Sequence, residues 1–222
     1  MKFEINAIHK KYGKKIPLSN VSFTVEDGQC VGILGKNGTG KSTLLSILAG
    51  VQSADKGAFL SDGTDLFRNG KLHASTVGYV PQGTPLLDEL SARDNLLLWY
   101  DKKALDKELD GGVLSMLGIN EFIKVPVRKM SGGMKKRLSI GCSVAKNPKL
   151  LLLDEPCAAL DLVCKQSIND YLLKFKRAGG ALILTTHDES DIALCDKIYI
   201  LKNGTLEPYE YDGDIERLTR ML

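Results

Sequence analysis

One stretch of eight residues has the composition and spacing of a phosphate-binding loop. It reads Gly35-Lys36-Asn37-Gly38-Thr39-Gly40-Lys41-Ser42 and matches the pattern GxxxxGK[ST] at every fixed position. Its glycines let the backbone curl so that N–H groups point at phosphate oxygens, and a helix that begins near Lys41 adds the positive end of its dipole. We expect Lys41 to contact the β- and γ-phosphates of a nucleotide and Ser42 to bind Mg²⁺. The alternative is an ordinary glycine-rich turn.

Two carboxylates directly follow a run of four leucines. The run 150–153 predicts a buried parallel strand, and Asp154 then emerges at its carboxyl end, where α/β proteins bind ligands. We expect Asp154 to hold Mg²⁺, directly or through water, and Glu155 to polarise an attacking water molecule. The alternative is a buried strand with two solvated acids at its mouth.

Three further side chains suit a nucleotide site, although none is diagnostic alone. His187 follows the apolar run 181–184 and two threonines, Gln82 follows an apolar run and Pro81, and Tyr12 lies in a polar turn. A histidine after a strand is more often structural than catalytic. We assign a function to each of the three only because they occur together with the glycine-rich loop and the two carboxylates.

The elements that must position these residues alternate between strands and helices. A helix is predicted over about 162–177, in addition to the one near residue 41. Strands are predicted at 2–8, 21–25, 30–34, 77–80, 150–153, 181–184 and 197–201. Such alternation implies a parallel sheet with helices on its faces. We predict an α/β fold: a P-loop NTPase core with a mostly parallel sheet and an antiparallel β part at the N-terminus.

The middle of the chain is mainly helical. Apolar residues recur there at three- and four-residue spacing, as at Leu105, Leu109, Val113 and Leu117. We predict a single nucleotide-binding domain over 1–222, with an α/β core at about 1–83 and 147–222 and a helical insert at about 84–146.

The composition excludes several classes of protein. The 222 residues are 43% hydrophobic and 26% charged, which argues against a disordered chain or a coiled coil. A net charge of +3 gives no compositional case for binding nucleic acid or a membrane surface. No apolar run approaches the roughly 20 residues of a membrane-spanning helix, and no secretory signal is visible. Five scattered cysteines indicate reduced, mostly buried thiols.

Together these residues resemble the nucleotide-binding subunit of ATP-binding-cassette (ABC) transporters, over nearly the whole chain and in the family's order. The decisive part is Ser131-Gly132-Gly133, which precedes a long predicted helix and is followed by Asp154-Glu155 about twenty residues later. The resemblance implies that Asp154, Ser42 and Gln82 hold Mg²⁺ and that Glu155, His187 and Lys41 act in catalysis. It also implies contacts with ATP from these positions: Tyr12 (adenine), Gly35 to Thr43 (phosphates), Gln82, Ser131, Gly132, Gly133, and Asp161 in Ala159-Leu160-Asp161.

The Ser-Gly-Gly signature also has a physical rationale. Ser131 is expected to cap the helix, and the two glycines bare the backbone for the approach of an anion. The resemblance implies that this anion is the γ-phosphate held by an opposite protomer, so that two chains sandwich two ATP molecules head to tail.

The signature departs from the common family pattern in its next residues. Met134 stands where many members have glutamine, and Lys135-Lys136-Arg137 follow. This variant resembles the branch that exports drugs, lipids or polysaccharides. The basic run either lies near an anion or forms a solvated face. A second departure is Cys157-Ala158-Ala159, where hydroxyl residues are frequent in the family.

The implied function is Mg²⁺-dependent ATP hydrolysis that drives transport, with export favoured. The implied partners are a second nucleotide-binding subunit, identical or different, and an integral membrane permease, with no nucleic acid. The chain would then be cytoplasmic and peripheral on the inner face of the membrane. Residues 83–87 with Trp99 and Tyr100 either form part of a docking groove or pack within the insert.

Two alternatives come from related proteins. A non-transport ABC ATPase would act as a clamp in translation or DNA maintenance; the single cassette, the small net charge and the absence of a coiled coil argue against it. A regulatory subunit with poor catalysis is disfavoured by the intact Lys41, Asp154, Glu155 and His187.

Overall fold

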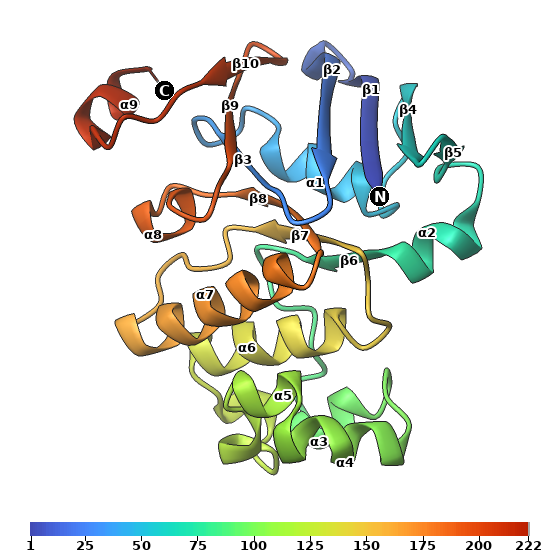
Figure 1. Cartoon of the computed structure of the whole chain (residues 1–222), viewed down its shortest axis with the longest axis vertical. Helices are drawn as coiled ribbons and strands as arrows, with labels where there is room; N and C mark the ends of the chain where they lie inside the picture. The colour runs from blue at the N-terminus through green and yellow to red at the C-terminus, as the bar shows by residue number, and fades with distance from the viewer. Residues whose placement is uncertain (222) are drawn as a thin grey trace.

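Two sheets and a helical part make up the structure, a computed structural model that describes residues 1–221 (Figure 1). The first sheet is antiparallel, with strand order β2-β1-β4-β5. Its strands are β1 (Lys2–Tyr12), β2 (Lys15–Glu26), β4 (Lys56–Ser61) and β5 (Thr64–Asp65). The predicted antiparallel part at the N-terminus is therefore confirmed.

The second sheet has six strands in the order β10-β9-β3-β8-β7-β6. All neighbouring strands in it run parallel except the β9–β10 pair. Its strands are β3 (Cys30–Leu34), β6 (Val77–Val80), β7 (Leu150–Asp154), β8 (Ala181–Thr185), β9 (Lys197–Lys202) and β10 (Thr205–Tyr209). Every residue of β3, β7 and β8 is buried, as expected for parallel strands covered on both faces.

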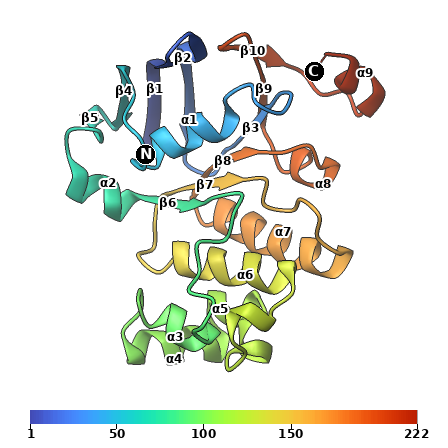
Figure 2. The same cartoon turned by 180° about the vertical axis from the view of Figure 1, so that it is seen from behind.

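Helices cover both faces of the parallel sheet. Seen from behind, α1 lies between the two sheets, whereas α6 and α7 lie on the far side of the parallel sheet (Figure 2). The α-helices are α1 (Lys41–Leu48), α2 (Gly70–Thr76), α3 (Ala92–Leu96), α4 (Lys102–Gly111), α5 (Val113–Met116), α6 (Gly132–Ser143), α7 (Leu162–Arg177), α8 (Glu189–Ile192) and α9 (Ile215–Met221). The 3₁₀ turns are η1 (Ile119–Phe122) and η2 (Val127–Lys129).

The leucine strand β7 shows how the sequence builds these layers. Successive side chains of a strand point to opposite faces. Leu150 and Leu152 pack in one hydrophobic cluster with α1 and the antiparallel sheet, and Leu151 and Leu153 pack in the other with α6 and α7. An unbroken apolar run is what such a two-sided position requires, and it brings Asp154 out at the edge of the sheet.

The helices α3 to α6 all lie between β6 and β7, in the region predicted as an insert. The last of them, α6, packs with α7 and the sheet in one hydrophobic cluster. The exact division into core and insert stays a prediction. Within residues 1–221, no helix combines the length and the apolar character needed to cross a bilayer.

The predicted strand limits were wrong at the N-terminus. Strand β1 continues to Tyr12 and β2 begins at Lys15, so Tyr12 ends a strand. Their pairing contains register shifts after Ile5, Ile8 and Lys10. Such irregularities break the period-two alternation from which strands are read in a sequence.

Candidate active site

A cavity of about 470 Å³ joins the glycine-rich loop to residues from other strands. The loop follows β3 and leads into α1, as predicted. The lining residues are Tyr12, Lys15, Pro17, Asn37, Gly38, Gly40, Lys41, Ser42, Thr43, Gln82 and Glu155. The fold thus brings together residues that lie up to 143 positions apart, from 12 to 155, in one concave site.

The loop leaves the start of α1 open toward this cavity. Gly40 is the N-cap of α1, with φ 117°, and no side chain caps the helix. A Cβ at Gly40 would lie 2.8 Å from the carbonyl oxygen of Pro17, so glycine is required there for both conformation and space. The uncapped N–H groups and the positive helix end form a site for an anion.

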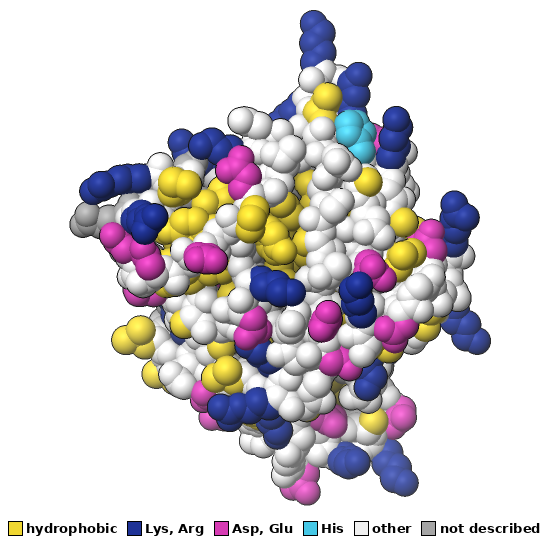
Figure 3. Space-filling model, turned by 45° about the horizontal axis from the view of Figure 1, so that its top comes forward, with side chains coloured by type: hydrophobic (Ala, Val, Ile, Leu, Met, Phe, Trp, Pro, Cys, Tyr) yellow, Lys and Arg dark blue, Asp and Glu magenta, His cyan; other side chains and the backbone are white. Residues whose placement is uncertain are grey.

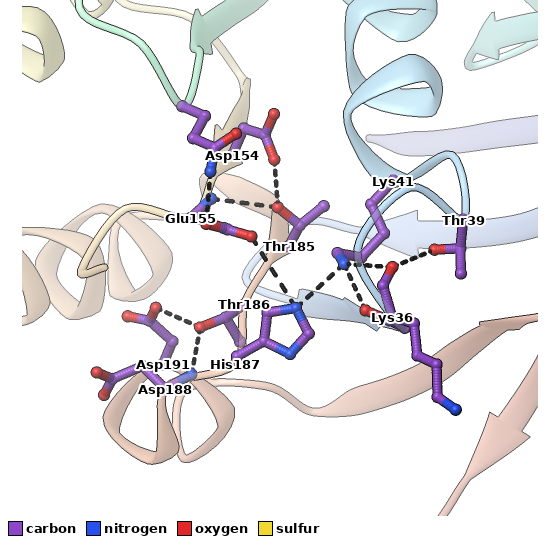
Figure 4. Close-up of polar contacts among 12 residues, drawn as sticks. Lys36, Thr39, Lys41, Asp154, Glu155, Thr185, Thr186, His187, Asp188 and Asp191 are labelled. Carbon is purple, nitrogen blue, oxygen red and sulfur yellow. Dashed lines mark hydrogen bonds and ion pairs between the residues drawn. The ribbon is translucent and has the colours of Figure 1, made fainter. Parts of the chain in front are cut away.

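Lys41 is buried at 6% exposure and reaches across the loop. Its ammonium donates to the carbonyl oxygens of Gly35 and Lys36, the latter at 3.2 Å, and lies 3.1 Å from Nε2 of His187 (Figure 4). Burial lowers the pKa of Lys41, against the opposing effect of Glu155 and Asp154. A desolvated ammonium that the loop itself holds is suited to bind phosphate.

Asp154 and Glu155 take different positions although they are adjacent. Asp154 is 2% exposed and accepts a hydrogen bond of 2.6 Å from the Thr185 hydroxyl. The backbone of Glu155 has φ 49°, a left-handed conformation, and its N–H donates to the Thr185 carbonyl at 3.0 Å. The chain therefore turns out of the sheet at Glu155, which aims its side chain into the cavity.

Glu155 lies between Gln82 and His187. Its Oε2 accepts a hydrogen bond of 2.9 Å from Nε2 of Gln82, and its Oε1 lies 4.0 Å from Nε2 of His187. Burial and the nearby Lys41 ammonium lower the pKa of His187, with Glu155 opposing. Because an ammonium can only donate, Nε2 of a neutral His187 accepts from Lys41 and the ring proton lies on Nδ1.

Tyr12 borders the same cavity with a 45% exposed ring. Its hydroxyl donates to the side chain of Gln52, and the Lys10 ammonium lies 5.4 Å from the ring centre. The contact with an adenine remains a prediction.

The residues that sequence reasoning missed are Lys15, Pro17 and Thr185. Lys15 Nζ donates to the carbonyl of Gly38 at 3.1 Å, and Pro17 closes against Gly40. Thr185 ends β8, the strand beside β7, and the register of the two strands places it opposite Asp154. Its polar side chain after an apolar run was the one sign of a site residue in the sequence.

The oxygen donors needed for Mg²⁺ are present. Ser42 and Gln82 line the cavity, and Asp154 emerges beside it at the end of β7. Among residues 1–221, no group of three or more His, Cys, Asp or Glu side chains could hold a metal ion. Mg²⁺ is usually bound by one or two carboxylates together with substrate phosphates and water, and Asp154 would be such a carboxylate.

Seven of the predicted ATP contacts are not among the lining residues: Gly35, Lys36 and Thr39 within the loop itself, and Ser131, Gly132, Gly133 and Asp161 on other elements. Ser131 caps α6, accepting from the Met134 N–H at 3.2 Å, so the capping prediction is confirmed. Asp161 caps α7 in the same way, with 2.8 Å to the Cys164 N–H. Their contact with a nucleotide held by a second chain stays a prediction.

The two signature glycines have different surroundings. A Cβ at Gly132 would meet nothing within 4 Å, whereas one at Gly133 would lie 2.8 Å from Sγ of Cys164 on α7. Gly133 is therefore needed for the close packing of α6 against α7. The backbone at Gly132 is not covered by other residues.

Two alternatives were open for the basic run, a position near an anion and a solvated face, and the solvated face does not hold for its middle residue, Lys136. Lys136 is 5% exposed and donates to the carbonyls of Pro81 and Gln82, each at 3.1 Å. Arg137 donates to the Leu117 carbonyl at 3.0 Å and lies 5.0 Å from the ring centre of Phe122. Of the three basic residues, only Lys135 pairs with an exposed side chain: its Nζ lies 3.6 Å from Oδ1 of Asp88.

Burial decides between the two alternatives for Tyr100 and confirms the prediction for the cysteines. Tyr100 is 8% exposed and donates to the Gly141 carbonyl, so it belongs to the core and not to a docking groove; Trp99 is 55% exposed. Four of the five cysteines are buried and all are free, as predicted. Desolvation raises the pKa of the Cys157 thiol, which disfavours its thiolate form.

Comparison with known proteins places the chain in one family. The sequence pattern of the family described as ABC transporter matches residues 18–158. Over 207 residues the chain is 35% identical to Nod factor export ATP-binding protein I of Sinorhizobium fredii (strain NBRC 101917 / NGR234), covering 90% of this chain and 60% of that protein. Over 212 residues it is 32% identical to the lantibiotic transport ATP-binding protein SrtF of Streptococcus pyogenes, covering 95% and 91%.

A solved structure gives the same result. The dimeric post-hydrolysis state of an ATP-binding cassette bound to ADP and Pi superposes with a TM-score of 0.82 at 26% identity, covering 96% of this chain and all of that one. The family pattern, the relatives and the shared fold agree with the cavity described above. The chain belongs to the ABC transporter family and has the fold of an ATP-binding cassette.

Proposed function

We propose that this chain hydrolyses Mg-ATP in a dimer of cassettes and thereby drives export through a membrane permease. The observation that carries the proposal is the continuous set of contacts from Lys41 through His187 and Glu155 to Gln82, beside the buried Asp154. It joins the phosphate loop to a carboxylate that the Gln82 amide orients.

Each side chain has a role that its position supports. Lys41 neutralises charge that develops on the transferred phosphoryl group. Glu155 accepts a hydrogen bond from the attacking water and orients it, while the amide of Gln82 fixes the carboxylate and His187 lies beside it next to Lys41. Ser42, Gln82 and Asp154 would hold Mg²⁺, which when bound neutralises charge on the phosphate oxygens. Tyr12 stacks on the adenine.

The signature suggests that a second chain completes the site. Gly132 presents open backbone at the start of α6, away from the cavity of its own chain. The solved cassette that superposes on this chain is a dimer bound to ADP and Pi. We infer a head-to-tail dimer in which Ser131, Gly132 and Gly133 of one protomer approach the γ-phosphate held by the other.

The partner in the membrane would dock on the helical part. Leu87, Leu98 and Trp99 are 52%, 61% and 55% exposed there, and exposed apolar patches mark interaction sites. On the face seen in Figure 3, basic and acidic side chains are interspersed and do not gather into one patch. The names of the two relatives refer to Nod factor export and lantibiotic transport, which favours export and a place on the inner membrane face over a clamp in translation or DNA maintenance.

Light scattering with Mg-ATP tests the dimer. In the Glu155→Gln background, which slows hydrolysis, the chain should become dimeric with ATP and remain monomeric with ADP. Adding Gly132→Asp should keep ATP binding and abolish the dimer, because the new carboxylate would face the phosphate. A normal ATP-driven dimer of that variant would refute the assignment. The transport role is tested by co-purification with any membrane-spanning protein that a neighbouring gene encodes, and Trp99→Ser should weaken that co-purification.

A further inference from the structure

Lys136 is a buried cation that the proposed catalytic steps do not use. It lies on the second turn of α6, five positions after the capping Ser131, and is 5% exposed. Burial of an ammonium is unfavourable unless its N–H groups are satisfied. Here two of them donate to the carbonyls of Pro81 and Gln82, at 3.1 Å each. The side chain therefore has a specific partner, the segment that follows β6.

These two hydrogen bonds connect α6, the signature helix that Ser131 caps, to the segment directly after β6. A second side chain, Ser143 at the other end of α6, donates to the Tyr79 carbonyl at 2.7 Å. The helix is thus anchored along β6 at both of its ends. The Lys136 anchor is the one that holds the backbone of Gln82.

From Gln82 the contacts continue to the catalytic carboxylate. The same residue whose carbonyl accepts from Lys136 donates its side-chain amide to Glu155 at 2.9 Å. A shift of α6 would therefore move the carbonyl of Gln82, and with it the amide on Glu155. Ser131 and Lys136 lie about 7.5 Å apart along the axis of one helix, from the rise of about 1.5 Å per residue.

The neighbouring basic residues do not share this position. Lys135 lies 3.6 Å from the exposed Asp88, and Arg137 binds the Leu117 carbonyl within the helical part. Within this basic run, Lys136 is the residue that connects α6 to the site. Lys135 therefore provides a matched control on the same helix turn.

We propose that Lys136 is a positioning residue that couples the signature helix to Gln82, and through Gln82 to Glu155. This inference rests on the proposed function, because it assigns Gln82 and Glu155 to hydrolysis. When the signature meets the partner's nucleotide, the Lys136 bonds make the backbone of Gln82 follow α6, and the amide of Gln82 orients the carboxylate.

A double-mutant cycle on hydrolysis tests the proposal. Lys136→Met keeps the length of the side chain and removes its donors. It should lower kcat about tenfold, the effect of losing roughly one charge-assisted hydrogen bond, with KM within about twofold. In a Gln82→Ala background the same change should alter kcat less than about twofold, because the amide through which Lys136 acts on Glu155 is already absent. Lys136→Arg, which keeps the donors, should retain at least about half of the wild-type kcat.

Two controls separate coupling from a general structural effect. Lys135→Met should leave kcat within about twofold of wild type, since its partner is exposed. An equal loss of kcat from Lys136→Met in the wild-type and Gln82→Ala backgrounds, or a change in KM alone, would overturn the proposal. If Lys136→Met does not fold, Lys136→Leu, which also lacks the donors, replaces it in the same cycle with the same criterion. A wild-type chain without Mg²⁺-dependent hydrolysis would instead refute the proposed function.

Discussion

Gly133→Ala should lower the free energy of unfolding, and the structure shows which contact causes the loss. The new Cβ would lie 2.8 Å from Sγ and 3.3 Å from Cβ of Cys164, which is 4% exposed in the packed contact of α6 and α7. Overpacking of this kind costs about 1–3 kcal/mol, and alanine regains up to about 1 kcal/mol over glycine in a helix. The free energy of unfolding should therefore fall by about 1–2 kcal/mol. Gly132→Ala is the control, because its Cβ meets nothing within 4 Å.

Urea unfolding of a double-mutant cycle measures this effect. Cys164→Ala removes the sulfur atom, so Gly133→Ala in that background should cost less than about 0.5 kcal/mol. Gly132→Ala should be neutral or stabilising by up to about 1 kcal/mol. The packing argument is refuted if Gly133→Ala costs the same with and without the Cys164 sulfur, or if Gly132→Ala is equally destabilising.

Three further predictions follow from single residues. Glu155→Gly should stabilise the fold by about 1 kcal/mol while abolishing hydrolysis, because φ 49° is unfavourable for a residue with a Cβ; urea unfolding and phosphate release measure the two effects, and a loss of stability would contradict it. Tyr12→Ala should weaken ATP binding about tenfold through lost stacking, with an unchanged melting temperature, since the ring is 45% exposed; titration with a fluorescent ATP analogue tests this, and an unchanged Kd would remove Tyr12 from the site. Lys165→Met should lower the free energy of unfolding by about 0.5–1 kcal/mol at pH 7, because its ammonium pairs with Asp188. Desolvation raises the pKa of Asp188, but hydrogen bonds from Lys165 and Ser190 more than offset it and hold that pKa below 3.8. The pair is therefore fully formed above pH 3.8, and the difference between the two proteins should shrink as the pH falls through the lowered pKa; a difference that is constant down to acid pH would contradict the assignment.

The parts of the site that could be predicted are contiguous in sequence. The glycine-rich loop and Asp154-Glu155 each follow an apolar strand, so the residues and the element that positions them are read together. The four leucines before Asp154 require burial on both faces, and this alone predicts a central parallel strand. The capping role of Ser131 followed from its place directly before a predicted helix.

The parts that could not be predicted depend on contacts between distant elements. Lys136 meets Pro81 and Gln82 across more than fifty positions, and a run of three basic residues does not reveal which one faces inward. Thr185 meets Asp154 through the register of β7 and β8, which no local pattern encodes. Tyr100 next to Trp99 illustrates the same limit, because the packing of the insert decides which ring is buried.

The strands missed at the N-terminus have a related cause. Strand β5 has only two residues, and β4 pairs with the irregular β1. Exposed residues alternate there with buried ones only in part, so the hydrophobic period is weak.

Phosphate release from Mg-ATP by wild-type and Glu155→Gln chains, with ATP binding measured on both, tests the central claim that Glu155 orients the attacking water. The account predicts Mg²⁺-dependent turnover for wild type, and for Glu155→Gln a rate at least about a hundredfold lower with ATP affinity within about twofold, as for loss of a general base. An unchanged rate in Glu155→Gln, or a loss of ATP binding equal to the loss of rate, would contradict it.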